Sequence, residues 1–513
     1  MRRHEVVFQP SRVAARVESG ATIAEAARTA GVPLEAPCAG AGACGKCVVQ
    51  IRRGSHLETA LACLARVESD LEVILPSLEM TPVQTVEAFL GAAQAPRWEG
   101  TGAEWGMALD LGTTTLVAAL VNLATGRIAG RSSTLCPLVA CGHDVVSRIR
   151  HARSHPRALR RMQRDLVCAV NMLSRRLGAE AGIETAAISR VVAAGNTTMQ
   201  HVFLGLPVAG LGEYPYRVAT LEACTMEASE VGLDVGPGAL VTTFPAMSAW
   251  VGGDIVAGLV AIGADTIERP ALFLDVGTNG EMVLLANGEL IAASTAAGPC
   301  FEGMSIHSGM RAAEGAIQHV RIADDLVLDV VGGGSPRGLC GSGLLDLVAE
   351  LRRAEIVSSR GRLAAPGSAT GPAALASRLF EEDGRRRMRL DGDVLVTQGD
   401  IRQVQLAKAA IRAGVDVLAG EAAMQSAELR TVFVAGAFGT HARESSILGV
   451  GLLPDDARGK LAFVGNASLE GATRALRAKS LLDEAARIAR TARVVDLAPT
   501  EAFPRAFRDA MSL

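Results

Sequence analysis

The chain has 513 residues, and its 51 Lys and Arg nearly balance its 54 Asp and Glu, giving a formal net charge of −3. This length is enough for three or four domains with large cores. The charge balance argues against a nucleic-acid partner, since no Lys- or Arg-rich block stands out except Arg385-Arg386-Arg387, which we interpret as a solvated turn. No stretch reaches about 18 uninterrupted apolar residues and no apolar signal core follows Met1, so we expect a soluble, cytoplasmic protein without a membrane partner.

The first 75 residues have the pattern of a small sheet with one helix. Residues 4–8 (His-Glu-Val-Val-Phe) predict a strand. A short helix is predicted between Thr22, its N-cap, and Gly31, its stop, with Glu25 completing a capping box. Two further apolar runs predict strands, at residues 47–51 and 71–75.

Four cysteines in this region have the spacing of iron–sulfur ligands: Cys38, Cys44, Cys47 and Cys63. The gaps hold five, two and fifteen residues, which is the plant-type ferredoxin pattern with one more residue in the first gap. Glycines in the loop allow backbone N–H groups to surround the sulfurs. A structural zinc site and unrelated buried thiols are the alternatives, although zinc sites usually use two short pairs. The sequence therefore predicts a [2Fe–2S] cluster and an electron-transfer function.

The order of strand, helix, cysteine loop and strands resembles a β-grasp ferredoxin. We therefore expect a ferredoxin-like domain over residues 1–80. Residues 81–104 contain several Pro and Gly with little periodicity, which predicts a linker. The remainder alternates apolar strands with amphipathic helices, as α/β layers do. We divide it into a first, middle domain over residues 105–240 and a C-terminal domain over residues 241–513.

Two segments of this α/β part resemble each other. Residues 107–115 and 272–280 each place Asp-x-Gly-Thr after an apolar strand and before a second strand. Backbone N–H groups and hydroxyls of such a turn can close on phosphate oxygens, and its aspartate can hold Mg²⁺ directly or through water. Two turns indicate a nucleotide site far more strongly than one. The predicted residues are Asp110 and Asp275 for Mg²⁺ or the attacking water, and Gly112, Thr113, Thr114, Gly277, Thr278 and Asn279 for phosphates.

These paired turns resemble the two phosphate loops of the actin, sugar-kinase and Hsp70 ATPases, which implies two ribonuclease-H-like halves. That superfamily also has an adenosine-contacting turn, and the apolar strand over residues 431–435 leads into a suitable one. The residues expected beside adenosine are Gly436, Ala437 and Gly439.

Further polar segments are weaker candidates for the same site. Gly341 and Ser342 belong to a glycine-rich loop expected before a helix at residues 344–351, and helix N-termini bind anions. Residues 196–198 (Asn-Thr-Thr) either contact nucleotide or cap a helix, which is their commoner use. Two carboxylates could position water or metal, although each is more often an ordinary satisfied polar group: Glu281 and Glu302.

A ferredoxin-like domain joined to an actin-like ATPase resembles the reductive activators of corrinoid proteins. The resemblance implies ATP-dependent transfer of one electron from the cluster to Co(II), which regenerates Co(I) for methyl transfer. It also implies Mg²⁺, a corrinoid methyl-transfer protein as partner, an upstream low-potential electron donor and a homodimer. The segments that carry it are residues 110–115, 194–199, 275–281, 297–304, 338–346, 397–401, 405–411 and 435–439.

Two other classes of function remain open at the level of sequence. A small-molecule kinase with a fused redox module would need an acceptor site, and no clear sugar-binding signature is present. A redox sensor would bind ATP without turning it over. Neither the methyl donor nor the particular corrinoid protein leaves a trace in the residues.

Overall fold

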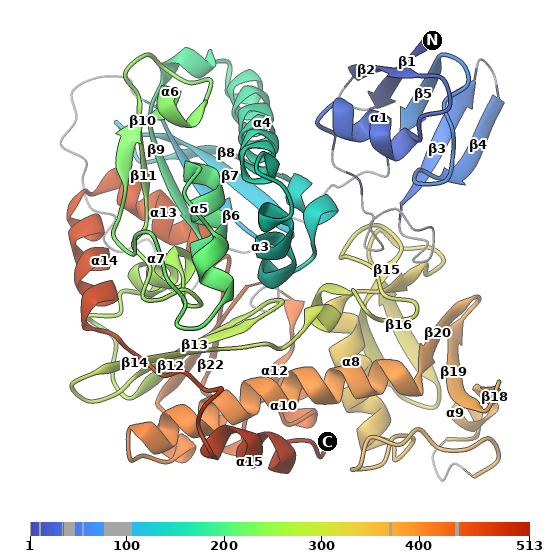
Figure 1. Cartoon of the computed structure of the whole chain (residues 1–513). Helices are drawn as coiled ribbons and strands as arrows, with labels where there is room; N and C mark the ends of the chain where they lie inside the picture. The colour runs from blue at the N-terminus through green and yellow to red at the C-terminus, as the bar shows by residue number, and fades with distance from the viewer. Residues whose placement is uncertain are drawn as a thin grey trace. The chain divides into compact units, whose positions relative to one another are not determined.

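The computed structural model describes residues 2–9, 12–32, 34, 47–53, 56–75, 105–368, 372–436 and 441–513 (Figure 1). Its described residues form two compact units. One contains the residues up to 75 together with 105–257 and 471–486, and the other contains 258–470 and 487–513. The chain therefore leaves the first unit and later returns to it. The expected linker over residues 81–104 lies outside the described residues.

The N-terminal part is a five-stranded sheet packed against one helix, of which the sequence pattern predicted the helix and three strands. Its strands run in the order β2-β1-β5-β3-β4, and β1 and β5 are parallel. Thr22 and Glu25 form the predicted capping box, and Gly31 has a φ of +67°, which suits glycine where the helix stops. The elements are β1 (Arg3–Gln9), β2 (Val13–Glu18), α1 (Ile23–Thr29), β3 (Val48–Arg53), β4 (His56–Leu61) and β5 (Leu71–Ile74).

The first α/β half is built on a six-stranded sheet in the order β10-β11-β9-β6-β7-β8. Apolar side chains of α3, α4 and α5 form one core with this sheet. The strands are β6 (Trp105–Leu111), β7 (Thr115–Asn122), β8 (Ile128–Leu135), β9 (Ile188–Gly195), β10 (Thr225–Glu227) and β11 (Leu240–Thr243). The helices are α3 (Val145–Arg153), α4 (Ala158–Ala181), α5 (Thr197–Leu204), α6 (Ala228–Val231), α7 (Gly253–Ile262), α13 (Ala467–Arg477) and α14 (Ser480–Thr491).

The second half has a six-stranded sheet in the order β22-β21-β12-β13-β14-β23. The long helix α10 packs on it, and α15 packs on α10 (Figure 1). The strands are β12 (Ala271–Val276), β13 (Gly280–Leu285), β14 (Leu290–Thr295), β21 (Thr431–Ala435), β22 (Leu461–Gly465) and β23 (Arg493–Val494). The helices are α8 (Gly341–Arg353), α9 (Ala373–Ser377), α10 (Gln398–Glu421), α12 (Glu444–Gly449) and α15 (Ala502–Asp509).

Two three-stranded sheets complete this half. The first has the order β16-β15-β17, and α8 lies against β15. The second has the order β18-β19-β20 and is fully antiparallel. Their strands are β15 (Ala316–Ile322), β16 (Leu326–Val330), β17 (Gly338–Leu339), β18 (Leu379–Glu382), β19 (Arg385–Asp391) and β20 (Val394–Thr397).

The two large sheets share one topology. Each begins with three antiparallel strands, β6-β7-β8 or β12-β13-β14, and continues with two strands parallel to the first. This repeat agrees with the paired turns in the sequence. The expected division at residues 240 and 241 falls at the start of β11, which belongs to the first sheet.

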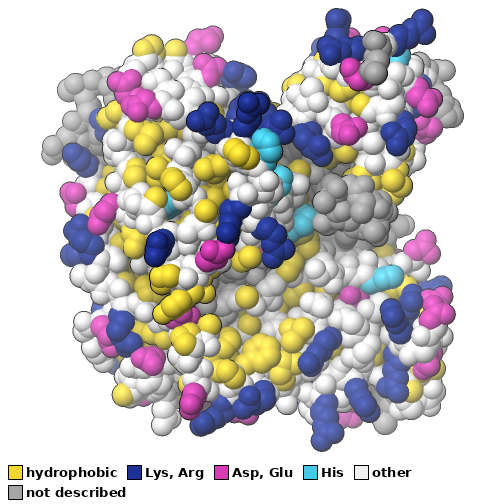
Figure 2. Space-filling model, in the orientation of Figure 1, with side chains coloured by type: hydrophobic (Ala, Val, Ile, Leu, Met, Phe, Trp, Pro, Cys, Tyr) yellow, Lys and Arg dark blue, Asp and Glu magenta, His cyan; other side chains and the backbone are white. Residues whose placement is uncertain are grey.

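No helix among the described residues is long and apolar enough to cross a membrane. On the face drawn in Figure 2, Lys and Arg side chains are interspersed with Asp and Glu, as the small net charge leads one to expect.

Candidate functional site

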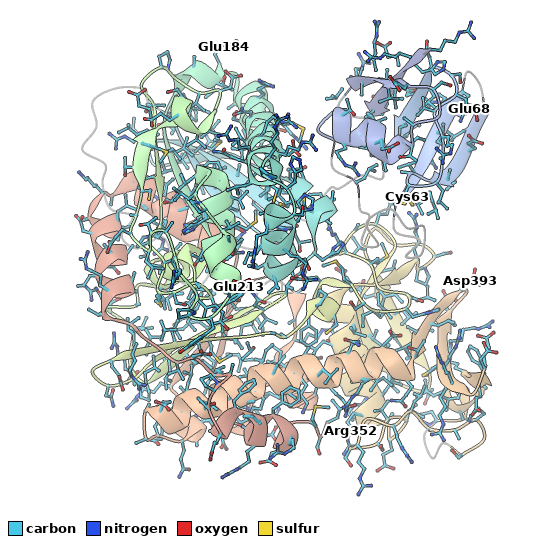
Figure 3. All side chains as sticks on the ribbon, in the orientation of Figure 1. Cys63, Glu68, Glu184, Glu213, Arg352 and Asp393 are labelled. Atoms are coloured by element: carbon cyan, nitrogen blue, oxygen red, sulfur yellow. The ribbon has the colours of Figure 1, made fainter. Side chains whose placement is uncertain are left out.

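Two of the four predicted cluster cysteines lie together at one end of the N-terminal sheet. Cys47 directly precedes β3, and Cys63 lies in the turn after β4 (Figure 3). Their Sγ atoms are 3.2 Å apart, and both side chains are buried. A disulfide would need a separation of about 2.05 Å. The backbone ties the two positions together, because Ala62 N donates to Cys47 O at 2.8 Å.

This pair suits two ligands of one metal group. The two thiols converge without forming a disulfide, and they belong to a buried apolar cluster with Val49 and Ala62, which limits the access of water to the pair. Cys38 and Cys44 lie outside the described residues. The described part of the structure thus contributes half of the predicted ligand set, in a geometry that fits a [2Fe–2S] cluster.

The first predicted phosphate turn connects β6 to β7. Asp110 is the next-to-last residue of β6 and is paired in register with Val117 of β7 and Ala194 of β9. Its carboxylate therefore projects at the carboxyl end of a central strand, where α/β sheets bind ligands. Gly112 is required in the turn, since a Cβ there would stand 2.3 Å from Thr115 O.

Side chains from two helices brace this turn. Asn196 Nδ2 donates to Thr113 Oγ1 at 3.0 Å, while Asn196 Oδ1 accepts from Met199 N at 3.0 Å and caps α5. The helix-cap interpretation of Asn196 is therefore confirmed, and the same side chain also holds the turn. Arg148 of α3 donates to Thr113 O.

The second turn connects β12 to β13 and has the same plan. Gly277 N donates to Asn279 O at 2.9 Å, and Gly298 N donates to Thr278 O at 2.8 Å. Thr278 Oγ1 donates to Glu302 Oε1 at 2.5 Å, so Glu302 is held at the turn by a side chain predicted to bind phosphate.

The strand predicted to precede the adenosine turn, β21, lies beside the second phosphate turn. Because β21 runs parallel to β12, Ala435 is paired in register with Asp275, and Gly436 follows at once. A Cβ on Gly436 would stand 2.4 Å from Asp275 Oδ1. Glu281 lies opposite Asp275 on β13 and is buried. Ala437 and Gly439 lie outside the described residues.

Carboxylates thus gather around the second turn, with Asp275, Glu281 and Glu302 on neighbouring backbone segments. Among the described residues, no group of three or more His, Cys, Asp and Glu side chains is placed to hold a metal ion by itself.

The glycine-rich segment before α8 differs from its prediction. The helix begins at Gly341 rather than near residue 344, so Gly341 and Ser342 lie in its first turn. A Cβ on Gly341 would stand 1.8 Å from Phe301 O, and Ser342 Oγ donates to Gln318 O at 2.9 Å. These residues are buried and serve close packing of α8, which a local glycine pattern does not distinguish from an open loop.

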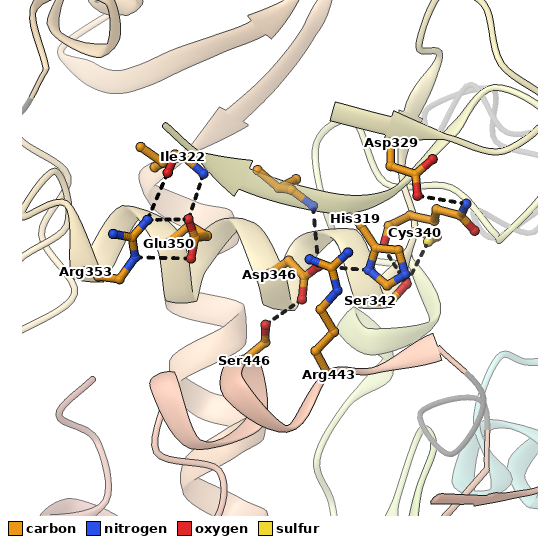
Figure 4. Close-up of polar contacts among 12 residues, drawn as sticks. His319, Ile322, Asp329, Cys340, Ser342, Asp346, Glu350, Arg353, Arg443 and Ser446 are labelled. Atoms are coloured by element: carbon orange, nitrogen blue, oxygen red, sulfur yellow. Dashed lines mark hydrogen bonds and ion pairs between the residues drawn. The ribbon is translucent and has the colours of Figure 1, made fainter. Parts of the chain in front are cut away.

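A buried polar cluster on α8 was not predicted. Asp346 is 1% exposed and accepts from Ser446 Oγ at 2.5 Å and from His319 Nδ1 at 2.9 Å, and Arg443 lies 3.4 Å away (Figure 4). Burial and the nearby His319 lower the pKa of His441. The cluster joins α8 and β15 to α12, which contributes Ser446 and its N-cap residue Arg443. Its signal in the sequence was the lone aspartate within the apolar run Leu344–Val348.

The fold and these sites define a class: a [2Fe–2S] ferredoxin domain fused to an actin-like ATPase of two related halves. Residues 6–68 match the 2Fe-2S iron-sulfur cluster binding domain, residues 105–266 the RACo middle region and residues 269–513 the C-terminal ASKHA domain of RACo. The chain therefore belongs to the RACo family, the reductive activators of corrinoid proteins.

Named relatives agree over most of their length. The chain is 27% identical to "Corrinoid activation enzyme RamQ" of Eubacterium limosum, over 89% of this chain and 90% of that protein. It is 27% identical to "[Co(II) methylated amine-specific corrinoid protein] reductase" of Methanosarcina barkeri, over 78% and 75%. A solved "Reductive activator for corrinoid,iron-sulfur protein" superposes with a TM-score of 0.73 at 28% identity, covering 99% of this chain and 98% of that one.

Proposed function

We propose that this chain is an ATP-dependent reductive activator that returns a corrinoid protein from Co(II) to Co(I). The observation that carries the proposal is the presence of both parts in one chain: a convergent cysteine pair in a ferredoxin-like sheet and duplicated Asp-x-Gly-Thr turns in two matching sheets. The names of the relatives support the same activity.

The cysteines would hold the electron-carrying group and shield it from water. Cys38, Cys44, Cys47 and Cys63 are the proposed ligands, and a plant-type [2Fe–2S] cluster bound there supplies one electron at a potential near −400 mV. The corrinoid cobalt gains that electron, and an upstream low-potential donor returns one to the protein. A transfer that is uphill by about 200 mV costs about 5 kcal/mol for one electron, which a nucleotide-driven change of conformation would offset.

The paired turns would hold Mg·ATP. Asp110 and Asp275 would bind Mg²⁺ or orient the attacking water, and the glycine and threonine positions of each turn would donate to phosphate oxygens. Gly436, pressed against Asp275, would link the adenosine side of the site to the phosphate side. We also propose a cytoplasmic homodimer, in line with the resemblance to the family.

The test is anaerobic reduction of a Co(II) corrinoid protein, followed by visible absorbance. The wild-type protein, with its cluster reconstituted and a chemical reductant present, should produce Co(I) only when Mg·ATP is added. Cys63→Ala should abolish this activity, because it removes one predicted cluster ligand. Cys168→Ala is the matched control, since Cys168 is an exposed free cysteine on α4.

Other outcomes point to the other classes. A reducible cluster and ATP turnover without Co(I), across several corrinoid partners, would contradict the proposal and favour a kinase. Nucleotide binding without turnover would favour a redox sensor.

A further inference from the structure

A fully buried arginine, Arg148, contacts the backbone of the first phosphate turn. Arg148 is on α3, where it shares the inward face with Val145 and Ile149, and its side chain is 0% exposed. Among the described residues, it is one of the largest side chains that are completely buried. Arginine is rarely buried unless it is paired, so this position calls for a physical reason.

The partners of the Arg148 guanidinium are all neutral. Its Nε donates to Gly142 O at 3.0 Å, and one Nη donates to Thr113 O. The other Nη lies 2.9 Å from Met199 Sδ and 3.7 Å from Cys136 Sγ, which are weak acceptors. Within the described residues, no ion pair joins Arg148 to a carboxylate.

Neutral acceptors satisfy N–H groups but leave the charge uncompensated. A guanidinium stays protonated in proteins, and burying a charge without a counter-ion is costly. An anion bound at the turn that Arg148 holds would supply the missing negative charge, and the water-poor surroundings would strengthen that attraction. A polyphosphate ligand at this turn would therefore account for the buried charge.

The same contacts fix the geometry of the turn. Arg148 holds the backbone at Thr113, and Asn196 holds the Thr113 side chain from the start of α5 at 3.0 Å. Both braces converge on a residue that the sequence assigns to phosphate binding. A turn held at its carbonyl and at its hydroxyl presents its N–H groups without reorganisation when the ligand binds.

We propose that Arg148 is a positioning residue of the first nucleotide turn, which fixes Thr113 and gives the turn a positive potential that favours polyphosphates over the uncharged nucleoside. The proposal rests on the nucleotide site assigned above. It adds a residue that lies outside every predicted motif and a reason for selectivity toward the phosphate part of the ligand.

The test compares Mg·ATP and adenosine as ligands of the full-length protein, with affinity measured by calorimetry and turnover by phosphate release. Arg148→Met keeps the volume but removes the charge, and it should raise Kd and KM for Mg·ATP by about 10- to 100-fold. The affinity for adenosine should stay within about twofold. Arg148→Lys restores the charge without the fork geometry and should recover part of the loss.

Two more variants keep the outcome interpretable. Arg150→Met is the matched control, because Arg150 is exposed on the same helix and should change neither ligand. Asn196→Ser retains a good N-cap but is too short to reach Thr113, so it should weaken Mg·ATP binding less than Arg148→Met does. It tests the same brace if Arg148→Met does not fold.

Three results would overturn the proposal. Arg148→Met and Asn196→Ser could both bind Mg·ATP as the wild type does. They could instead lose adenosine and Mg·ATP affinity equally, with no rescue by lysine, which would indicate a purely structural role. Finally, a wild-type protein that binds no Mg·ATP would remove the nucleotide site itself, and this outcome is distinct from a failure of Arg148 alone.

Discussion

At Gly436 the backbone and a neighbouring carboxylate together exclude any side chain. The φ is +76°, and a Cβ would meet Asp275 Oδ1 at 2.4 Å and Val276 O at 2.9 Å. We expect Gly436→Ala to lower the free energy of unfolding by about 2 kcal/mol and to weaken Mg·ATP binding, since Asp275 must move.

Chemical denaturation and ATP titration would measure both effects. Gly420→Ala is the matched control, because Gly420 lies within α10 with nothing inside 4 Å of the added Cβ. It should stabilise the protein by about 0.5–1 kcal/mol. Equal stability of the two variants would contradict the close approach at Gly436.

Lys408 is a buried amine whose charge opposes folding. It is 2% exposed on α10, and its ammonium donates to Ser512 O. Burial, reinforced by the nearby Arg412, lowers the pKa of Lys408 to about 8 from an ordinary value of 10.5. Because the folded-state pKa is the lower one, the unfolded chain binds more protons between these values, and stability should rise with pH through this window.

The contribution of Lys408 over that window is about 3 kcal/mol. We expect Lys408→Met to flatten the rise, so that urea denaturation from pH 7.5 to 10.5 shows a smaller increase than in the wild type. Lys479→Met, at an exposed lysine, should leave the curve unchanged. Parallel curves for wild type and Lys408→Met would show that the buried amine does not carry this dependence.

Among the elements, α10 depends on its first turn. Thr397 Oγ1 accepts from Asp400 N at 3.2 Å, and Asp400 Oδ2 accepts from Thr397 N at 2.8 Å, which completes a capping box. Asp400 Oδ1 also accepts from His307 N at 2.8 Å, so the cap fixes a neighbouring loop.

We expect Thr397→Ala to lower the free energy of unfolding by about 1 kcal/mol. Thr397→Ser, which keeps the hydroxyl, should stay within about 0.5 kcal/mol of the wild type. Thermal or urea denaturation would distinguish them. The cap would be unimportant if the two variants were equally stable.

The helices α1, α3 and α8 show which features could be predicted from neighbouring residues in the sequence. Thr22, Glu25 and Gly31 predicted the bounds of α1, because capping is decided within a few residues. The start of α8 was misplaced, because Gly341 is needed for the approach of Phe301, which is distant in sequence. The role of Arg148 could not be predicted from the sequence. Its importance depends on the contact with Thr113, which is 35 residues away in the chain.

At the scale of the whole molecule, the first unit is discontinuous. After β22 the chain returns to it with residues 471–486, and Leu476 of α13 packs against Gly106 of β6, where a Cβ would meet it at 3.0 Å. Arg477 likewise lies over Gly126. Residues 105–257 therefore lack part of their core when they are taken alone.

We expect a fragment of residues 105–257 to be poorly folded, because the surface that α13 covers would be exposed. A fusion of residues 105–257 to residues 467–486 should recover cooperative unfolding and resistance to proteolysis. Circular dichroism and limited proteolysis would compare the two. An independently stable 105–257 fragment would show that the returning segment adds little.

The sequence by itself determined the class of this protein. Cysteine spacing, the repeated Asp-x-Gly-Thr turns and the alternation of apolar strands are local patterns, and they predicted the ferredoxin-like sheet, the two actin-like halves and the family. The tertiary structure decided contacts that the sequence did not predict: Gly436 against Asp275, and Arg148 with Thr113. These contacts follow from strand order and helix packing, which no single stretch of the chain specifies, because each depends on elements tens to hundreds of residues apart.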